Sequence, residues 1–288
     1  MGIDNVPAPG IHHNVPPETY HSWQALSHSW MGRLRQSPAH LLDLMDNGAE
    51  RSSPNLNFGS AVHCLVLEPS EYPKRFAIRP DGEKGNTKAG LNFAAAARKQ
   101  NMVVLSSIEG RWCEAVARRA AANSRLRDWL KRPHATEVSL VWERDGYMCK
   151  ARADLLVDGI AIVADLKTTV TASPKGFASQ VAKYHYHEQA AWYMDGLRRL
   201  TGRVWDFYFL ACEKQRPFLV TAHQLVRDSS AWDVATTECE RLFALYKQCC
   251  ESRLWPGYED VYEIELPTWA MTSDGAETEP DAAAEPFE

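Results

Sequence analysis

Two Asp-Gly pairs, Asp145-Gly146 and Asp158-Gly159, divide the apolar stretch between residues 136 and 168 into three segments. Asp-Gly favours the left-handed backbone of a two-residue hairpin turn, and the segments are rich in residues typical of strands. We therefore predict strands at 136–143, 147–157 and 160–168, paired as an antiparallel meander. Two-residue turns also determine which residues lie opposite one another across the strands.

Counting back from these turns gives a definite register. In the first hairpin Glu137 faces Asp154, and in the second Arg152 faces Asp165. Opposed side chains share a sheet face, so one face gathers six charged residues: Glu137, Lys150, Arg152, Asp154, Asp165 and Lys167. The other face is expected to carry apolar core residues: Val138, Leu140, Leu155, Val157, Ala164 and Leu166.

The third strand contains IVADLKTT, in which Asp165 and Lys167 interrupt a run that is otherwise apolar on both faces. Such a strand is expected to be central and covered, where an unpaired charge is costly to bury. A salt-bridged solvent face is the alternative. We favour a covered cluster of carboxylates that binds a cation. Oxygen ligands without cysteine favour Mg²⁺, or Mn²⁺ as a substitute, over zinc.

Helical patterns surround the meander, which predicts an α/β fold with a central mixed β-sheet flanked by helices. Helices are expected within 22–47 (two), and at 59–67, 91–100, 107–131, 173–182, 186–201 and 229–252, with further strands at 204–212 and 218–225. The polar segment 79–90 is predicted to be a surface loop. We expect a flexible segment at 1–20, a single domain at 21–271 and a disordered acidic tail at 272–288.

Charge and cysteine content restrict the function. The net charge is −5, but residues 272–288 hold six acids and no base, so residues 1–271 carry a net +1 and any anion-binding surface must be local. Seven cysteines without CxxC spacing indicate neither a disulfide framework nor a zinc or iron–sulfur site. No apolar run is long enough to cross a membrane and no signal peptide opens the chain, so we expect a cytoplasmic protein.

An ordered set of motifs links these residues. Asp154 is followed by Asp165-Leu166-Lys167 and then by Gln189 and Tyr193, while His63 lies upstream in FGSAVHCLVLEP. This set resembles the PD-(D/E)XK nuclease superfamily, and within it the RecE-like exonucleases (exonuclease VIII) of phage type. The segments RQSPAHLLDL at 35–44 and TKAG at 87–90 are also similar to that group, and the matches run from about residue 29 to 200.

The resemblance implies roles for individual residues. Asp154, Asp165 and the carbonyl of Leu166 would bind one or two metal ions per site, with His63 as a further ligand that helps to hold the second ion. Lys167 would orient and help deprotonate the attacking water, or stabilise the charge that builds on the phosphate in the transition state. The alternative for Lys167 is a salt bridge to Asp165 at the end of the strand. Glu137 is expected either to orient that water or to form a salt bridge with Arg152 or Lys150.

The resemblance also implies DNA contacts. Gln189 and Tyr193, four residues apart on one helix, would form a wall of the site and touch the DNA. Arg152, Lys84 and Lys88 are further candidates for phosphate contacts. Arg33 and Arg35 are also plausible, with a solvated basic surface as the alternative for these arginines and for both lysines.

The implied function is a Mg²⁺-dependent exodeoxyribonuclease that degrades linear double-stranded DNA from its ends, 5′ to 3′. It would leave 3′ single strands for recombination by a RecT-like annealing protein, acting as a ring-shaped homo-oligomer, a trimer or tetramer, in a bacterial or phage-infected cell. The alternatives are a RecB-type or CRISPR-associated nuclease of other polarity, or a catalytically inactive DNA-end-binding module. The complete set of His63, Asp154, Asp165 and Lys167 argues against an inactive site.

Overall fold

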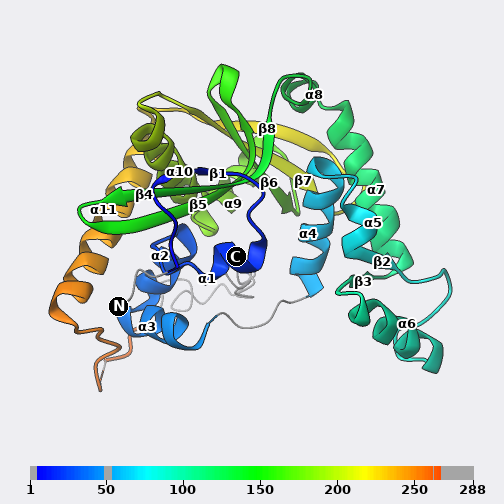
Figure 1. Ribbon diagram of the computed structural model, residues 1–288, viewed down its shortest axis with the longest axis horizontal. Helices are drawn as coiled ribbons and strands as arrows, with labels where there is room; N and C mark the ends of the chain where they lie inside the picture. The colour runs from blue at the N-terminus through cyan, green and yellow to red at the C-terminus, as the bar shows by residue number, and fades with distance from the viewer. Residues whose placement is uncertain (1–4, 49–53, 262, 267–288) are drawn as a thin grey trace.

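A six-stranded sheet forms the centre of the protein, with strand order β1-β4-β5-β6-β7-β8 (Figure 1). The computed structural model describes residues 5–48, 54–261 and 263–266. The strands are β1 (Gly10–His12), β4 (Ala135–Arg144), β5 (Tyr147–Val157), β6 (Ile162–Thr169), β7 (Asp206–Glu213) and β8 (Val220–Leu225). β6 and β7 are parallel, and the other neighbouring pairs are antiparallel. The predicted mixed sheet with an antiparallel meander is confirmed.

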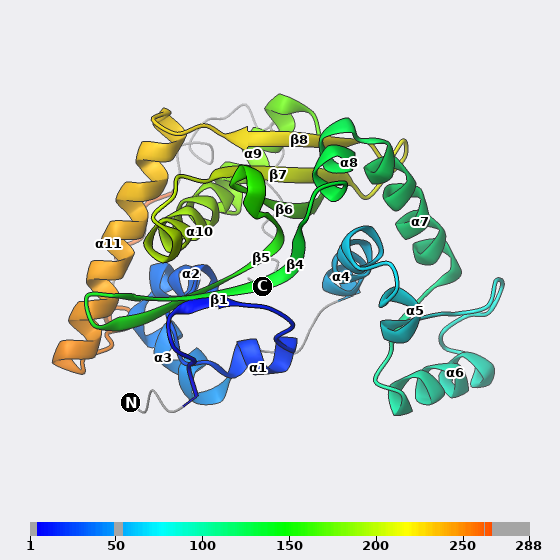
Figure 2. The same ribbon diagram turned by 45° about the horizontal axis from the view of Figure 1, so that its top comes forward.

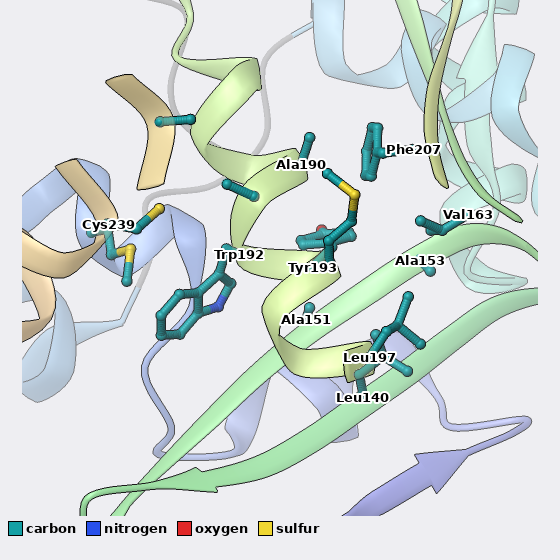
Figure 3. Close-up of a cluster of buried hydrophobic side chains, with 14 of the residues drawn as sticks. Leu140, Ala151, Ala153, Val163, Ala190, Trp192, Tyr193, Leu197, Phe207 and Cys239 are labelled. Carbon is teal, nitrogen blue, oxygen red and sulfur yellow. The ribbon is translucent and has the colours of Figure 1, made fainter. Parts of the chain in front are cut away.

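Helices cover both faces of this sheet (Figure 2). One apolar cluster joins the sheet to α2 (His28–Gln36), α3 (Pro38–Asn47), α9 (Pro174–Lys183), α10 (Tyr186–Thr201) and α11 (Ser230–Ser252). A second joins it to α4 (Pro54–Leu67), α7 (Ser107–Ala122) and α8 (Ser124–Leu130). Figure 3 shows Trp192, Tyr193 and Leu197 of α10 within the first cluster. No described helix is long and apolar enough to span a membrane.

A small module projects from the main body beside α7 (Figures 1 and 2). It consists of α5 (Tyr72–Arg75), the parallel pair β2 (Phe76–Ile78) and β3 (Val103–Leu105), and α6 (Lys88–Lys99). The loop predicted at 79–90 lies between β2 and α6, except that Thr87 caps α6 and the helix already begins at Lys88.

Local capping explains where several helices begin. The side chain of Ser37 accepts a hydrogen bond from the backbone N–H of His40, with Pro38 in the first turn of α3, as the Ser-Pro sequence favours. Asn123 ends α7 and its side chain caps α8. The single helix predicted at 107–131 is therefore two helices, because Asn123 supplies a helix start in the middle of the pattern.

The first hairpin has the predicted register, from Arg144 opposite Tyr147 to Ala135 opposite Leu156. Asp145 and Gly146 both have positive φ, 48° and 84°, as a two-residue turn of this type requires. Continuing the pairs places Glu137, which is itself kinked (φ 51°), beside Asp154.

The second hairpin differs from the prediction by two residues. Val157 pairs with Ile162 rather than Ile160, because residues 158–161 form a short 3₁₀ turn that ends on Ala161 at φ 50°. The expected pairs of Arg152 with Asp165 and of Lys150 with Lys167 are therefore wrong. One step beyond the last observed pair, Leu155 with Ala164, Asp154 lies across from Asp165. Because the shift is by an even number of residues, side chains of β5 and β6 that were expected on the same side of this hairpin still share a side.

The expected single apolar face is also wrong. Val138 and Leu140 pack in the cluster with α10, whereas the other four residues predicted for that face pack with α4 and α7: Leu155, Val157, Ala164 and Leu166. The change occurs next to Glu137, whose left-handed backbone breaks the regular alternation of the strand.

Residues 1–20 are not a flexible end in the part that the structure describes. β1 pairs with β4 at the edge of the sheet, α1 (Pro17–Ser22) follows, and Tyr20 and Trp23 are buried. The prediction of a flexible segment relied on its proline and histidine content. It was wrong because β1 is ordered by pairing with β4, which lies more than a hundred residues away in the sequence. The predicted acidic tail at 272–288 lies outside the described residues.

Close packing of α10 on the sheet makes Gly196 sensitive to substitution. A Cβ there would lie 2.7 Å from the ring of Trp142, which is 1% exposed. Gly196→Ala is expected to destabilise the protein by about 2 kcal/mol, because overpacking outweighs the gain in helix propensity. Urea unfolding would measure this. Gly159→Ala, whose Cβ would meet no atom within 4 Å, is the control, and equal stability of the two variants would contradict the packing.

Candidate active site

Strands β4, β5 and β6 and helices α4 and α10 bring the predicted site residues together. α4 contributes His63, and β4 and β5 contribute Glu137 and Asp154. β6 contributes Asp165 and Lys167, whose side chains point to the same side of the strand because they are two residues apart. α10 contributes Gln189 and Tyr193, which lie one turn apart. Every side chain that was predicted to act in catalysis or to bind metal therefore lies in this one region.

His63, Glu137 and Asp154 form a compact group. One potential ligand atom from each lies within 4.8 Å of the others. Nδ1 of His63 is 3.2 Å from Oδ2 of Asp154, and the same oxygen accepts a hydrogen bond of 2.7 Å from the backbone N–H of Leu166. Glu137 accepts a hydrogen bond of 2.8 Å from Nε of Arg152. The salt bridge expected for Glu137 is therefore present, and its carboxylate also belongs to the group.

Asp165 lies at the adjoining end of the site, 2% exposed. Its Oδ1 accepts a hydrogen bond of 2.9 Å from the side-chain amide of Gln189, which also donates to the hydroxyl of Tyr193 at 3.1 Å. Its Oδ2 is 2.9 Å from Nζ of Lys167. The Gln189–Tyr193 pair thus holds Asp165 in place from α10, while Lys167 holds it along its own strand.

Burial of these acids produces an electrostatic environment that suits a cation. Burial raises the pKa of Asp154 to about 6, with His63 opposing the rise and nearby Asp165 adding to it. Burial and the charge of Asp165 also raise the pKa of Tyr193. Within the described residues, buried Oδ2 of Asp165 accepts no hydrogen bond of normal geometry, although it pairs with Lys167. Carboxylate and imidazole ligands around such a site fit a divalent cation.

Several predicted ligands and DNA contacts stay predictions. Asp165 and the carbonyl of Leu166 were expected to bind metal with Asp154 and His63, but the compact group contains Glu137 rather than Asp165. Arg152 was expected to contact DNA. Its side chain is only 14% exposed and pairs with Glu137.

The other basic candidates lie elsewhere. Lys84 and Lys88 are exposed on the projecting module. Arg35 pairs with Glu188 and Glu238, and Arg33 lies on the same helix, α2. Lys150, predicted to share the charged face, forms hydrogen bonds with backbone groups instead: Nζ donates to the carbonyls of Tyr20 and Trp23 at 2.9 and 2.7 Å.

Two tyrosines near the site were not predicted. The Tyr20 ring lies 5.6 Å from the guanidinium carbon of Arg152, and the Tyr186 ring lies 4.6 Å from Nζ of Lys167. Tyr20 was missed because it lies in a segment taken to be flexible. For Tyr186 a signal existed: it precedes Gln189 by three residues, so it shares the helix face that carries Gln189 and Tyr193.

A comparison with known protein families shows to which family the chain belongs. Residues 27–265, most of the chain, match the family described as "PDDEXK-like domain of unknown function (DUF3799)". The chain belongs to this family. Membership of DUF3799 confirms the PD-(D/E)XK-like fold that the motifs around Asp154, Asp165 and Lys167 predicted. No curated protein matches the chain.

A solved structure shows the same fold as this DUF3799 member. A structure from Eubacterium rectale, named "Putative exonuclease", is 15% identical with a TM-score of 0.57, and covers 91% of this chain and 100% of its own. A second, named SSO0001, is 14% identical and covers 71% of this chain and 83% of its own. Its TM-score of 0.30 is too low to bear on the fold.

Proposed function

We propose that this protein is a divalent-metal-dependent exodeoxyribonuclease that degrades linear double-stranded DNA from its ends. The observation that carries the proposal is the partly buried cluster in which Asp154 lies across from Asp165, with His63 paired to the first acid and Lys167 to the second. A PD-(D/E)XK-like fold that keeps each of these groups fits phosphodiester hydrolysis. The name of the structure from Eubacterium rectale supports an exonuclease in particular.

The ligand set fits Mg²⁺, or Mn²⁺ in its place. His63, Glu137 and Asp154 would hold the ion, with Asp165 close enough in the site to share it. A bound divalent ion supplies Lewis acidity toward the phosphate and lowers the pKa of water. The N–H of Leu166 orients the carboxylate of Asp154, and Arg152 orients that of Glu137.

The remaining residues would handle the proton and the substrate. Lys167, paired with Asp165, is placed to orient a water and take part in its deprotonation. Gln189 fixes Asp165 through its amide, and Tyr193 lies behind Gln189. The hydroxyl oxygen of Tyr193 accepts the hydrogen bond from Gln189, and its own proton would be donated to a phosphate oxygen.

An end-labelling experiment tests the proposed activity. Linear duplexes labelled at the 5′ or 3′ end, and a closed circular duplex, are incubated with wild type and Asp165→Ala, in Mg²⁺ or EDTA. We expect early loss of the 5′ label by wild type only, in Mg²⁺ only, with the circle intact. The control is Asp158→Ala, an exposed acid paired with Arg203, which should keep full activity. Equal activity in Asp165→Ala would exclude the site.

The same experiment separates the alternatives. Early loss of the 3′ label would indicate a nuclease of the other polarity, such as a RecB-type or CRISPR-associated enzyme. Binding to duplex ends without cleavage would indicate an inactive end-binding module.

The cellular role and partners are also part of the proposal. We propose a homo-oligomer, a trimer or tetramer, that supplies 3′ single strands to a RecT-like annealing protein for recombination. Light scattering of the purified protein would give its oligomeric state. Co-purification with the annealing protein would test the partner.

A further inference from the structure

Two contacts of the Lys167 ammonium bear on its position. Nζ lies 2.9 Å from Oδ2 of Asp165 and 4.6 Å from the centroid of the Tyr186 ring. An ammonium within about 6 Å of an aromatic face is attracted by the quadrupole of the ring, more strongly where water is excluded. The Lys167 side chain is only 14% exposed. The ring contact is therefore well shielded from solvent.

One stripe of α10 faces both charged residues of β6. Tyr186, Gln189 and Tyr193 are spaced by three and then four residues, so they lie on the same helix face. Gln189 binds Asp165, and Tyr186, one turn nearer the start of the helix, contacts Lys167. The helix thus holds the acid and the base of the strand at separate points.

The Tyr186 ring is held by groups other than Lys167. It stacks on Tyr184, with centroids 5.6 Å apart and planes 29° apart, and lies 6.1 Å from Phe209. Phe209 is on β7, directly beside Asp165 of β6. These contacts fix the orientation of the Tyr186 ring, so the flexible side chain of Lys167 packs against a ring that does not move with it.

A neighbouring histidine, His28, adds no positive charge beside Lys167. His28 is buried near Lys167, and burial, with contributions from Lys167 and Arg35, lowers its pKa to about 3. The imidazole is therefore neutral at physiological pH and does not repel the ammonium.

We propose that Tyr186 is a positioning residue for Lys167: its ring face fixes the ammonium beside Asp165. A lysine amine on its four-carbon stem has many rotamers, and a single ion pair does not select one of them. The inference rests on the proposed nuclease function, because it assigns Lys167 a task at the reacting water.

Four variants test this in turnover experiments. Tyr186→Phe keeps the ring, and Tyr186→Leu removes it. Lys167→Ala and the double variant Lys167→Ala/Tyr186→Leu complete a double-mutant cycle. We expect Tyr186→Leu to lower kcat about tenfold, with DNA binding measured in Ca²⁺ unchanged, and Tyr186→Phe to stay within about twofold of wild type. In the Lys167→Ala background, loss of the ring should have no further effect.

Other outcomes would overturn the role. A fall in kcat as large in Tyr186→Phe as in Tyr186→Leu would assign the effect to the hydroxyl. A fall that persists in the Lys167→Ala background would show that Tyr186 acts independently of Lys167. Weaker DNA binding with unchanged kcat would make Tyr186 a substrate contact instead.

A spectroscopic measurement does not depend on activity. In protein with ¹³Cε-labelled lysine, the ε-methylene signal of Lys167 is assigned by its absence in Lys167→Arg. The ring current of Tyr186 should displace this signal upfield in wild type and Tyr186→Phe, and the displacement should disappear in Tyr186→Leu. An undisplaced signal in wild type would exclude the contact. If wild type degrades no DNA, the proposed function fails while this contact is still tested.

Discussion

Asp154→Asn is expected to lower nuclease activity by about a thousandfold or more. Asparagine has nearly the same shape as aspartate, and its carbonyl oxygen can still accept the hydrogen bond from the N–H of Leu166. What disappears is the negative charge beside His63 and Glu137 on which cation binding depends. Initial rates on a linear duplex at saturating Mg²⁺ measure the effect.

Metal-linked stability separates this loss from misfolding. Burial of the Asp154 carboxylate raises its pKa, so its ionised form destabilises the metal-free protein at neutral pH. Asp154→Asn should therefore melt at or above the wild-type temperature without metal, and should lose the stabilisation that Mg²⁺ gives wild type. Asp158→Asn, an exposed substitution of the same kind, should retain both properties. Activity of Asp154→Asn within about tenfold of wild type would contradict the proposed role.

Lys150→Met is expected to change how stability depends on pH. Burial lowers the pKa of Lys150 to about 8, against about 10.4 in an unfolded chain. Below pH 8 both states are protonated. Between pH 8 and pH 10.4 the Lys150 amine is deprotonated in the folded state but still protonated in the unfolded state. Because the unfolded state then binds more protons, the free energy of unfolding rises with pH.

The difference in unfolding free energy between wild type and Lys150→Met should therefore grow in favour of wild type by up to about 3 kcal/mol between pH 7.5 and 10.5. This is an upper value, since the ring of Tyr20, 4.7 Å from Nζ, favours the charged amine. Urea unfolding across this pH range measures it. Lys99→Met, on the surface of α6, controls for the lost charge. A difference that does not change with pH would contradict the burial of a charged amine.

Local turn chemistry explains why one hairpin was predicted fully and the other only in part. Asp145-Gly146 adopts the positive φ values that its residue types favour. In the second turn the left-handed residue is Ala161, at φ 50°, and alanine carries no local signal for that conformation. The second register moved by two residues, so the predicted opposition of Arg152 to Asp165 was wrong, and Asp154 lies across from Asp165 instead.

The part of the site that lies on regular helices and strands could be predicted from the spacing of its residues along the chain. The period of a strand places Asp165 and Lys167 on one side of β6, and the period of a helix places Gln189 and Tyr193 on one face of α10. That this face of α10 lines the site was implied by the family resemblance and not by the spacing. Contacts that depend on long-range packing were not predictable. Tyr20 lies on the short helix α1, which follows the edge strand β1, and its ring contacts Arg152. No local pattern in the sequence indicates that β1 pairs with β4 or that Tyr20 contacts Arg152.

The segment around Tyr20 shows that the region matched by the family is shorter than the unit that folds. The family match begins at residue 27, whereas the carbonyls that accept hydrogen bonds from Lys150 belong to Tyr20 and Trp23. A protein trimmed to the family boundary would leave a buried ammonium without these acceptors and would uncover the edge of β4. The portion of the chain that should be transplanted or expressed as one piece therefore begins before Gly10.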